Sequence, residues 1–222
     1  MDTKDMYRGI DLKDIYKGTT TIGLKCKDGV VLVSDSRASM GSFIASKEAR
    51  KIYKISDHVA GTVAGSVGDA EKFMELLNVE AAFYKMQNGK ELSPKGISSL
   101  GTTILHVNRY YPYLVQILIC GYNTETNTGE IYSIDPIGGV TEEDAASTGS
   151  GSLTAYGVLE AEYSAKKTIE ENLKLGIKAI SIAIERDSAT GNHIRSAFIT
   201  REGYKELPDD EVKKIYDEVK RK

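Results

Sequence analysis

The chain has the sequence Lys17-Gly18-Thr19-Thr20-Thr21-Ile22-Gly23 at the point where a polar leader ends and a β-branched strand begins. Cleavage after Gly18 would make Thr19 a new N-terminus, with an α-amine beside its own hydroxyl. These two groups are a weak base and a nucleophile on one residue, which is one form of an activated nucleophile. Threonine also favours strands for packing reasons alone, so the rest of the chain decides between the two interpretations.

A β-hairpin is predicted directly after this stretch. A strand over Thr19–Lys27, a turn at Asp28-Gly29 and a strand over Val30–Ser36 give the Asp-Gly signal between two apolar runs. The second strand begins with side chains that are apolar on both faces, so we expect it to be covered on both sides. An ideal turn at Asp28-Gly29 pairs Asp35 with Ile22, and a longer turn or a bulge would be needed to bring Asp35 to Thr19.

Turn, capping and periodicity signals predict the remaining elements. Strands are expected over Ile52–Ile55, Val59–Ala64, Leu114–Tyr122, Glu130–Ile134, His193–Thr200 and Tyr204–Leu207. Helices are expected from an Asp69 N-cap to Gly89, from Ser93-Pro94 to about Tyr110, around Ala155–Tyr163, from a Thr168/Glu171 capping box to Arg186, and from Pro208 onward. Two stacked antiparallel sheets with helices outside, a four-layer αββα sandwich of the α+β class, account for this order. A two-layer α+β fold fits it as well.

Length and composition indicate one globular domain. The chain has 222 residues, of which 41% are hydrophobic and 27% charged, and its net charge is −3. Its basic residues are scattered, which argues against nucleic acid or an anionic membrane as the main partner. No apolar run reaches the roughly 20 residues that a membrane span needs. Residues 1–18 carry four aspartates and lack the apolar core of a secretory signal.

The two cysteines, Cys26 and Cys120, lie in apolar strand-like runs. We expect buried free thiols, because small domains that are stapled by disulfides use far more cysteine. Free thiols are typical of a reducing compartment, so the expected location is cytoplasmic.

The sequence lacks the motifs of several common kinds of binding and catalytic site. Gly149–Gly151 precedes a helix, but the sequence has neither a P-loop nor a dinucleotide-binding glycine pattern. His58, His106 and His193 lie in unrelated contexts without a GxSxG elbow, so serine–histidine catalysis is not indicated. No cysteine and histidine cluster has the spacing of a metal site, and no cofactor or metal is expected.

Two acidic residues stand out. Asp35 ends an apolar strand, where a carboxylate is costly unless it is paired. Two cations follow it in the sequence: Arg37, two residues on and on the same strand face, and Lys51 a little later. A structural salt bridge is the commoner explanation for such a residue. Asp187 follows the helix that ends at Arg186, and a structural role, in which it caps the C-terminal end of that helix together with Ser188, explains it as well as a catalytic role does.

Seven motifs along the chain carry a family resemblance. They are Gly18-Thr19-Thr20-Thr21, Ser34-Asp35-Ser36-Arg37, Lys51-Ile52-Tyr53, Thr62-Val63-Ala64-Gly65-Ser66-Val67-Gly68-Asp69, Gly121-Tyr122, Ser147-Thr148-Gly149-Ser150-Gly151-Ser152 and Glu185-Arg186-Asp187-Ser188-Ala189-Thr190-Gly191. In this order they resemble a proteasome β subunit of the archaeal type over nearly all of residues 19–222. That family consists of N-terminal-nucleophile hydrolases with the αββα sandwich, which selects between the two folds left open above.

The resemblance implies a threonine peptidase. Thr19 would be the nucleophile of a single catalytic domain, residues 19–222, after autocatalytic removal of the propeptide 1–18 between Gly18 and Thr19. Lys51 would favour proton loss from Thr19, and its ammonium would lower the pKa of the nearby amine by like-charge repulsion. Asp35 would pair with Lys51 and orient it.

Further roles follow from the same resemblance. Gly65 would supply a backbone N–H to the oxyanion, and Ser150, Asp187 and Thr190 would support the Thr19 amine. Relatives often carry serine in place of Thr190 and threonine in place of Ser39, and the hydroxyl is kept in both cases. The 18-residue leader is long for an archaeal member of the family.

The expected substrate is unfolded polypeptide held by main-chain pairing beside Ser39. The pocket for the side chain before the scissile bond would be lined by small or apolar residues, which predicts cleavage after hydrophobic residues. These wall residues are Ala38, Ala49, Tyr53, Val63 and Val67.

The resemblance also implies partners. The family forms stacked seven-membered rings in which β subunits meet one another and proteasome α subunits, and an ATP-dependent unfoldase feeds the chamber. Two alternative functions are disfavoured by the sequence. One is a catalytically silent structural β subunit, against which the presence of Thr19, Asp35 and Lys51 argues. The other is an amidase for a small molecule, which the absence of a charged pocket residue and the Ser147–Ser152 stretch disfavour.

Overall fold

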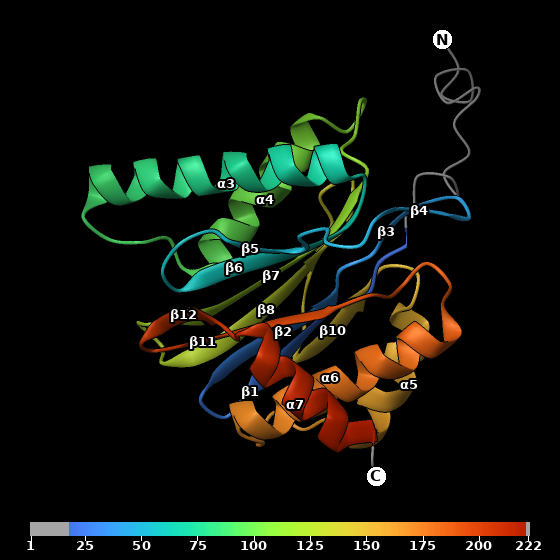
Figure 1. Cartoon of the computed structure of the whole chain (residues 1–222). Coiled ribbons are helices and arrows are strands. Elements are labelled where there is room, and N and C mark those ends of the chain that lie inside the picture. Colours follow the sequence, from blue (N-terminus) through green and yellow to red (C-terminus); the bar gives the residue numbers. More distant parts are fainter. Residues whose placement is uncertain (1–17, 221–222) are drawn as a thin grey trace.

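The computed structural model describes residues 18–220 as four layers, with helices on the outside and two antiparallel β-sheets between them (Figure 1). This is the predicted αββα sandwich, and the two-layer alternative is wrong. The predicted propeptide lies outside the described residues except for Gly18. No helix in residues 18–220 is both long and apolar enough to cross a membrane.

The first sheet has five strands in the spatial order β10-β1-β2-β11-β12, and all neighbours are antiparallel. Its strands are β10 (Ala145–Thr148), β1 (Thr21–Cys26), β2 (Gly29–Asp35), β11 (Ile194–Thr200) and β12 (Gly203–Glu206). Because β1 and β2 lie inside this sheet, both of their edges are paired and their side chains are covered on both faces. The fully buried β2 confirms the expectation drawn from its apolar start.

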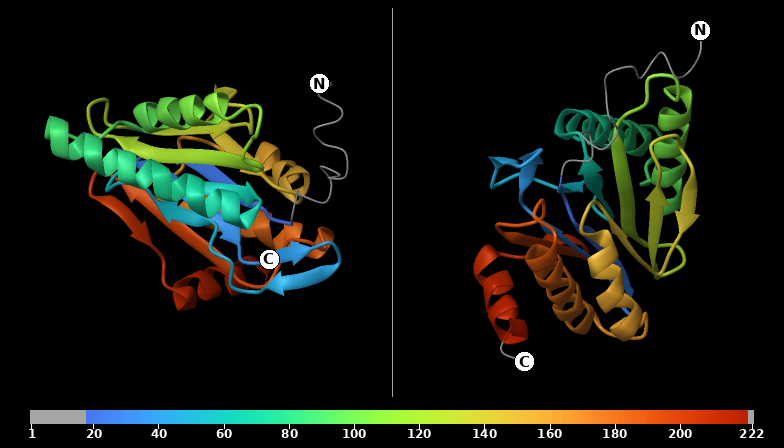
Figure 2. Two further views of the ribbon diagram at one scale, coloured as in Figure 1. Left: turned by 90° about the horizontal axis from the view of Figure 1, so that it is seen from above. Right: turned by 90° about the vertical axis from the view of Figure 1, so that its right-hand side faces the viewer.

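The second sheet has the order β5-β6-β7-β8-β9 and is also antiparallel. Its strands are β5 (Ile52–Lys54), β6 (Val59–Gly65), β7 (Val115–Asn123), β8 (Thr128–Ile134) and β9 (Val140–Glu142). A separate hairpin, β3 (Ala38–Met40) and β4 (Phe43–Ser46), projects from the edge of the sandwich (Figure 2).

Helices cover the two outer faces. The second sheet is covered by α3 (Val67–Asn88) and α4 (Pro94–Val107), and the first sheet by α5 (Ser152–Glu162), α6 (Ile169–Arg186) and α7 (Asp209–Lys220) (Figure 1). The apolar stripe of α6 lies against β1 and β2 in one core cluster. A second cluster joins α3 and α4 to the second sheet, and a third fills the space between the sheets. Three apolar layers therefore separate four layers of backbone.

The β1–β2 turn differs from the prediction. Cys26 pairs with Gly29, so the two turn residues are Lys27 and Asp28 and not Asp28 and Gly29. The register consequently shifts by two residues, and Asp35 extends beyond the pairing of Thr21 with Ser34 to lie beside Thr20. Neither a longer turn nor a bulge is needed to bring Asp35 to the start of β1.

Helix starts were predicted well where the signal was local. The Ser93 cap with Pro94, the Thr168 and Glu171 capping box and the exit at Gly89 are confirmed. The prediction that Asp69 caps α3 is wrong, because the helix begins at Val67 and its N-cap is Ser66. The Asp69 carboxylate instead accepts a hydrogen bond from the Leu114 backbone, at the start of β7.

Candidate active site

The site contains a buried carboxylate. Asp35 ends β2 and is completely buried. Its Oδ1 accepts hydrogen bonds from the Thr20 backbone N–H at 2.9 Å and from Lys51 Nζ at 2.6 Å. Its Oδ2 accepts from the backbone N–H groups of Arg37 and Gly191 at 3.1 and 2.9 Å. Four donors therefore compensate the carboxylate for the water it has lost.

The partner of this carboxylate is Lys51, and not the Arg37 side chain, which bonds to Asn192 and the Ser188 carbonyl. Lys51 directly precedes β5, and its carbonyl accepts from the Val63 N–H of β6 at 3.1 Å. Burial holds the pKa of the Lys51 ammonium below its usual value, while Asp35 acts in the opposite direction. The sheet edge thus fixes a poorly solvated cation beside a fixed carboxylate.

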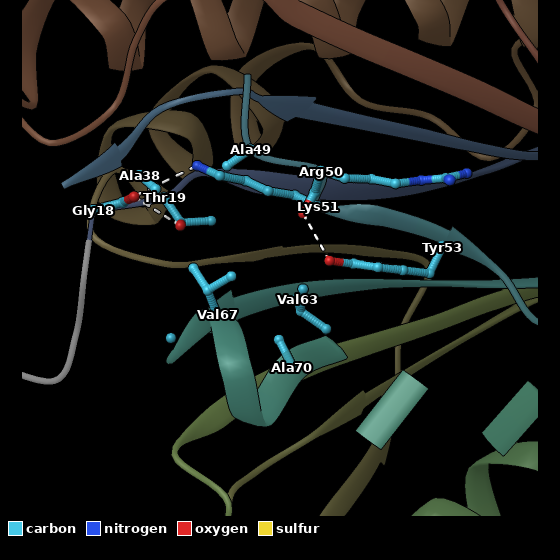
Figure 3. A pocket seen from close by; sticks show the side chains of 11 residues that line it. Gly18, Thr19, Ala38, Ala49, Arg50, Lys51, Tyr53, Val63, Val67 and Ala70 are labelled. Atoms are coloured by element: carbon cyan, nitrogen blue, oxygen red, sulfur yellow. Dashed lines mark hydrogen bonds between the residues drawn. The ribbon is translucent and has the colours of Figure 1, made fainter. Parts of the chain in front are cut away.

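Thr19 lies next to this ion pair. Its Oγ1 donates to the carbonyl oxygen of Gly18 at 2.8 Å, and Lys51 Nζ approaches the same oxygen at 3.5 Å (Figure 3). The Gly18 N–H in turn donates to Ser39 Oγ at 3.0 Å. The peptide bond between Gly18 and Thr19 is therefore held next to the hydroxyl that follows it.

A chain of hydroxyl groups and a carboxylate lies on the nitrogen side of Thr19. The Thr19 N–H donates to Ser150 Oγ at 3.3 Å, and Ser150 Oγ donates to Asp187 Oδ2 at 2.5 Å. Thr190 Oγ1 donates to the same carboxylate oxygen at 2.6 Å. Ser150 comes from the turn before α5, and Asp187 and Thr190 come from the turn after α6. Two helix ends therefore converge on one backbone nitrogen.

A pocket opens beside the hydroxyl of Thr19. Each predicted wall residue lines it, together with Gly18, Lys51 and Gly65 (Figure 3); the wall residues are Ala38, Ala49, Tyr53, Val63 and Val67. Gly65 ends β6 with a φ of 130°, and a Cβ there would lie 2.2 Å from the Leu114 carbonyl oxygen, so the turn into α3 needs glycine. The pocket thus gathers residues from four separate stretches of chain, which are 18–19, 38, 49–53 and 63–70.

A profile of the family described as "Proteasome subunit" matches residues 15–199. The chain belongs to the proteasome family. A "Proteasome subunit beta" of Methanocaldococcus vulcanius is 52% identical over 203 residues, covering 91% of either chain. One from Methanocaldococcus fervens is 50% identical over 207 residues, which is 93% of this chain and 92% of the relative. One from Methanococcus maripaludis strain C7 is 47% identical over 211 residues, or 95% and 96%.

The family accounts for the architecture and the general role. The αββα sandwich is the N-terminal-nucleophile hydrolase fold of proteasome β subunits, and the chain is a subunit of the proteasome core. The resemblance to an archaeal β subunit is confirmed, since these relatives come from archaeal methanogens.

Two further pocket residues were not predicted. Arg50 lines the pocket between Ala49 and Lys51, but its side chain runs along β5, where Nε donates to the Ile52 carbonyl at 2.9 Å (Figure 3). Ala70 lies one helical turn after Val67. Helical spacing from Val67 could have found Ala70, because residues three apart lie on one face of a helix.

Thr20 was also missed. Its Oγ1 is 2.7 Å from Thr190 Oγ1, so it extends the network around Asp187. Its place beside Thr19 in the threonine run was the available signal.

Proposed function

We propose that the chain is a threonine endopeptidase subunit of the 20S proteasome core, with Thr19 as its nucleophile. One observation carries the proposal. The Thr19 hydroxyl and the Lys51 ammonium both approach the carbonyl oxygen of Gly18, at 2.8 and 3.5 Å. A hydroxyl and a poorly solvated cation at one peptide carbonyl are the groups that attack on that carbonyl requires.

The first reaction would be cleavage of the chain's own Gly18–Thr19 bond, which removes the propeptide 1–18. Thr19 Oγ attacks the Gly18 carbonyl carbon, and the hydroxyl proton passes to the Thr19 nitrogen as the C–N bond breaks. Gly18 is then joined to Thr19 Oγ as an ester. Water hydrolyses this ester, which releases the Gly18 carboxylate and leaves Thr19 with a free α-amine. Lys51 would stabilise the negative charge that develops on the Gly18 oxygen.

The second reaction would be hydrolysis of peptide substrates. The free amine of Thr19 accepts the proton of its own hydroxyl, directly or through water, while Oγ attacks the substrate carbonyl. The proton then passes to the leaving amine, and water hydrolyses the acyl ester. Lys51, oriented by Asp35, would favour the ionised hydroxyl. Ser150, with Asp187 and Thr190, would orient the amine. The Gly65 N–H would donate to the oxyanion.

The pocket walls support a preference for cleavage after hydrophobic residues. Small and apolar side chains face it, and the Arg50 guanidinium is engaged with the Ile52 carbonyl and lies 5.7 Å from the Tyr53 ring centroid. An extended substrate would pair with the backbone beside Ser39, which gives little sequence selectivity. Fluorogenic peptides test this preference: those ending in Leu, Phe or Tyr should be cleaved faster than acidic or basic ones.

The proposed partners are proteasome α subunits, further β subunits in seven-membered rings, and an ATP-dependent unfoldase that supplies unfolded polypeptide. Cys26 and Cys120 are buried free thiols, as predicted. Free thiols fit a reducing compartment, so the proposed location is the cytoplasm.

Intact mass after co-expression with the organism's α subunit tests the function. We expect a mass corresponding to residues 19–222 for the wild type and a full-length mass for Thr19→Ala. A peptide epoxyketone, which reacts with the hydroxyl and the free amine together, should add once to the processed chain and not to the variant. A wild-type chain that assembles but stays full length and inactive would overturn the proposal and favour a silent structural subunit.

A further inference from the structure

Three threonine hydroxyls to which the proposed mechanism gives no role meet in the interior. Thr21 Oγ1 lies 2.8 Å from Thr62 Oγ1 and 2.7 Å from Thr148 Oγ1. Thr21 and Thr62 are completely buried, and Thr148 is 7% exposed. Since a hydroxyl can donate once and accept twice, Thr21 can satisfy both neighbours at the same time.

The hydroxyl cluster Thr21/Thr62/Thr148 joins the two sheets. Thr21 and Thr148 belong to β1 and β10 of the first sheet, where their backbones already pair, and Thr62 belongs to β6 of the second. Among residues 18–220, the bond from Thr21 to Thr62 is the one hydrogen bond between a strand residue of one five-stranded sheet and a strand residue of the other. The layer between the sheets is otherwise formed by apolar side chains.

The proposed catalytic groups come from both sheets. In the first sheet, Thr19 lies two residues before β1 and Asp35 ends β2. In the second sheet, Lys51 directly precedes β5 and Gly65 ends β6. The distance from the nucleophile to the lysine and to the oxyanion donor therefore depends on how the sheets are placed laterally. Apolar contact between two sheets is not directional, but a hydrogen bond is.

Each member of the cluster is close in sequence to one of these groups. Thr21 is two residues after Thr19, Thr148 is two residues before Ser150, and Thr62 is three residues before Gly65. Valine has nearly the same shape, favours strands and would avoid the cost of burying a hydroxyl. The presence of three buried hydroxyls between the sheets is therefore explained by the directional hydrogen bonds that they form more readily than by packing.

We propose that Thr21, Thr62 and Thr148 are positioning residues, which set the lateral placement of the two sheets and thereby the approach of Lys51 and Gly65 to Thr19. The proposal rests on the threonine peptidase activity proposed above. A displacement of about 1 Å from the reactive geometry can cost about 100-fold in rate, so a junction next to the site can control kcat while it touches neither substrate nor nucleophile.

The test uses the chain assembled with its α subunit and compares variants that remove one bond or all of them. Thr62→Val breaks the bond between the sheets, and Thr148→Val breaks the bond within the first sheet. Thr62→Ser restores the hydroxyl. Thr128→Val is the matched control, because it breaks an exposed bond between two threonine hydroxyls, from Thr128 at the start of β8 to Thr126 in the preceding turn (2.8 Å). A Thr21→Val/Thr62→Val/Thr148→Val triple variant removes every hydroxyl and leaves none unpaired in the cluster.

We expect Thr62→Val to lower kcat per processed subunit about tenfold with KM within about twofold. Thr148→Val should have the smaller effect, because backbone pairing holds β1 and β10 together without it. Thr62→Ser should restore most of the rate, and Thr128→Val should match the wild type. The triple variant should assemble with a thermal midpoint close to the wild type and still show the low kcat.

A triple variant with wild-type kcat would overturn the proposal. A triple variant that does not assemble would also overturn it, because the hydroxyls would then be needed for folding. A loss that Thr62→Ser does not rescue would also contradict it. Failure of the peptidase proposal is distinguishable, since the wild type and the Thr128→Val control would then be inactive as well.

Discussion

Two Lys–Asp pairs have lysines that lie three residues apart in the sequence, and their contact distances are nearly the same. Lys51 Nζ is 2.6 Å from Asp35 Oδ1, and Lys54 Nζ is 2.8 Å from Asp57 Oδ1. The side chains of the first pair are 5% and 0% exposed, whereas those of the second are 46% and 55% exposed. Lys51 directly precedes β5 and Lys54 ends it, so a buried ion pair and an exposed one lie at opposite ends of the same short strand.

The comparison shows that environment, more than contact distance, decides what an ion pair does. Hydrogen bonds from Lys54 and Lys85 hold the pKa of Asp57 below its usual value, but water can replace either lysine. At the buried pair, burial lowers the pKa of Lys51, and the carboxylate is held by three backbone N–H groups as well. The buried pair therefore holds an ammonium with a lowered pKa, whereas the exposed pair contributes little to the free energy of unfolding.

The largest difference should come from removing each lysine. Lys51→Ala leaves the Asp35 carboxylate buried without its cation, which should cost about 3–5 kcal/mol of unfolding free energy and lower peptidase activity about 10²–10⁴-fold. Lys54→Ala should cost less than about 1 kcal/mol and leave activity unchanged. Thermal unfolding and peptide hydrolysis of the assembled complexes measure both effects. Equal losses in the two variants would contradict the comparison.

The same contrast applies to backbone packing. A Cβ on Gly18 would lie 1.9 Å from Ala189 Cβ and 2.3 Å from the Ala189 carbonyl oxygen, whereas a Cβ on Gly157 in α5 meets nothing within 4 Å. Gly18→Ala should therefore displace the carbonyl of residue 18 from the Thr19 hydroxyl and slow self-cleavage by up to about 100-fold. Gly157→Ala should process normally and gain up to about 1 kcal/mol from helix propensity. A time course of intact mass distinguishes them, and normal processing of Gly18→Ala would refute the steric argument.

The lowered pKa of Lys51 predicts a pH dependence of stability. Between this lowered pKa and the usual lysine value, the unfolded chain holds more protons on residue 51 than the folded chain, so stability rises with pH. In a Thr19→Ala background, the unfolding free energy of the wild-type lysine relative to Lys51→Met should therefore increase toward alkaline pH. A difference that stays flat would show that folding leaves the pKa of Lys51 unchanged, and one that falls would show that folding stabilises the ammonium; either result would contradict the prediction.

The smallest effect concerns a buried group without an opposite charge. Burial raises the pKa of the Cys26 thiol to about 12, although Asn172 Nδ2 lies 3.5 Å from the sulfur. Since the thiolate is the reactive form, iodoacetamide at pH 8 should leave Cys26 unmodified in the folded complex and modify it in denaturant. Mass spectrometry of the digested chain measures this, and rapid labelling of the folded chain would contradict the burial argument.

Elements with local signals were the ones that sequence could predict. The capping box of Thr168 and Glu171 and the Ser93-Pro94 start depend on residues within one helical turn. The β3–β4 hairpin, which is absent from the predicted elements, also has a local signal in Gly41-Ser42. β10 had none, because Ala145-Ala146-Ser147-Thr148 is a strand through its pairing with β1.

The residues of the candidate site were named from the sequence because their types and order match a family, and the matched pocket walls do line one cavity with Thr19. Their convergence could not be derived from spacing. The predicted turn placed Asp35 opposite Ile22, and a shift of two residues in the turn brings it to Thr20. Alternation along a strand fixes which residues share a face, but it does not fix which turn closes the hairpin.

By itself, the sequence determined the alternating strands and paired helices, the presence of Thr19 just before β1 and the chemistry that its hydroxyl can perform. Only the tertiary structure decided that Lys51 and not the Arg37 side chain pairs with Asp35, and that Thr21 meets Thr62 across the two sheets. The physical reason is that helix caps and strand faces depend on neighbours along the chain. Ion pairs and hydroxyl contacts between sheets depend on register and stacking, which the whole core sets together.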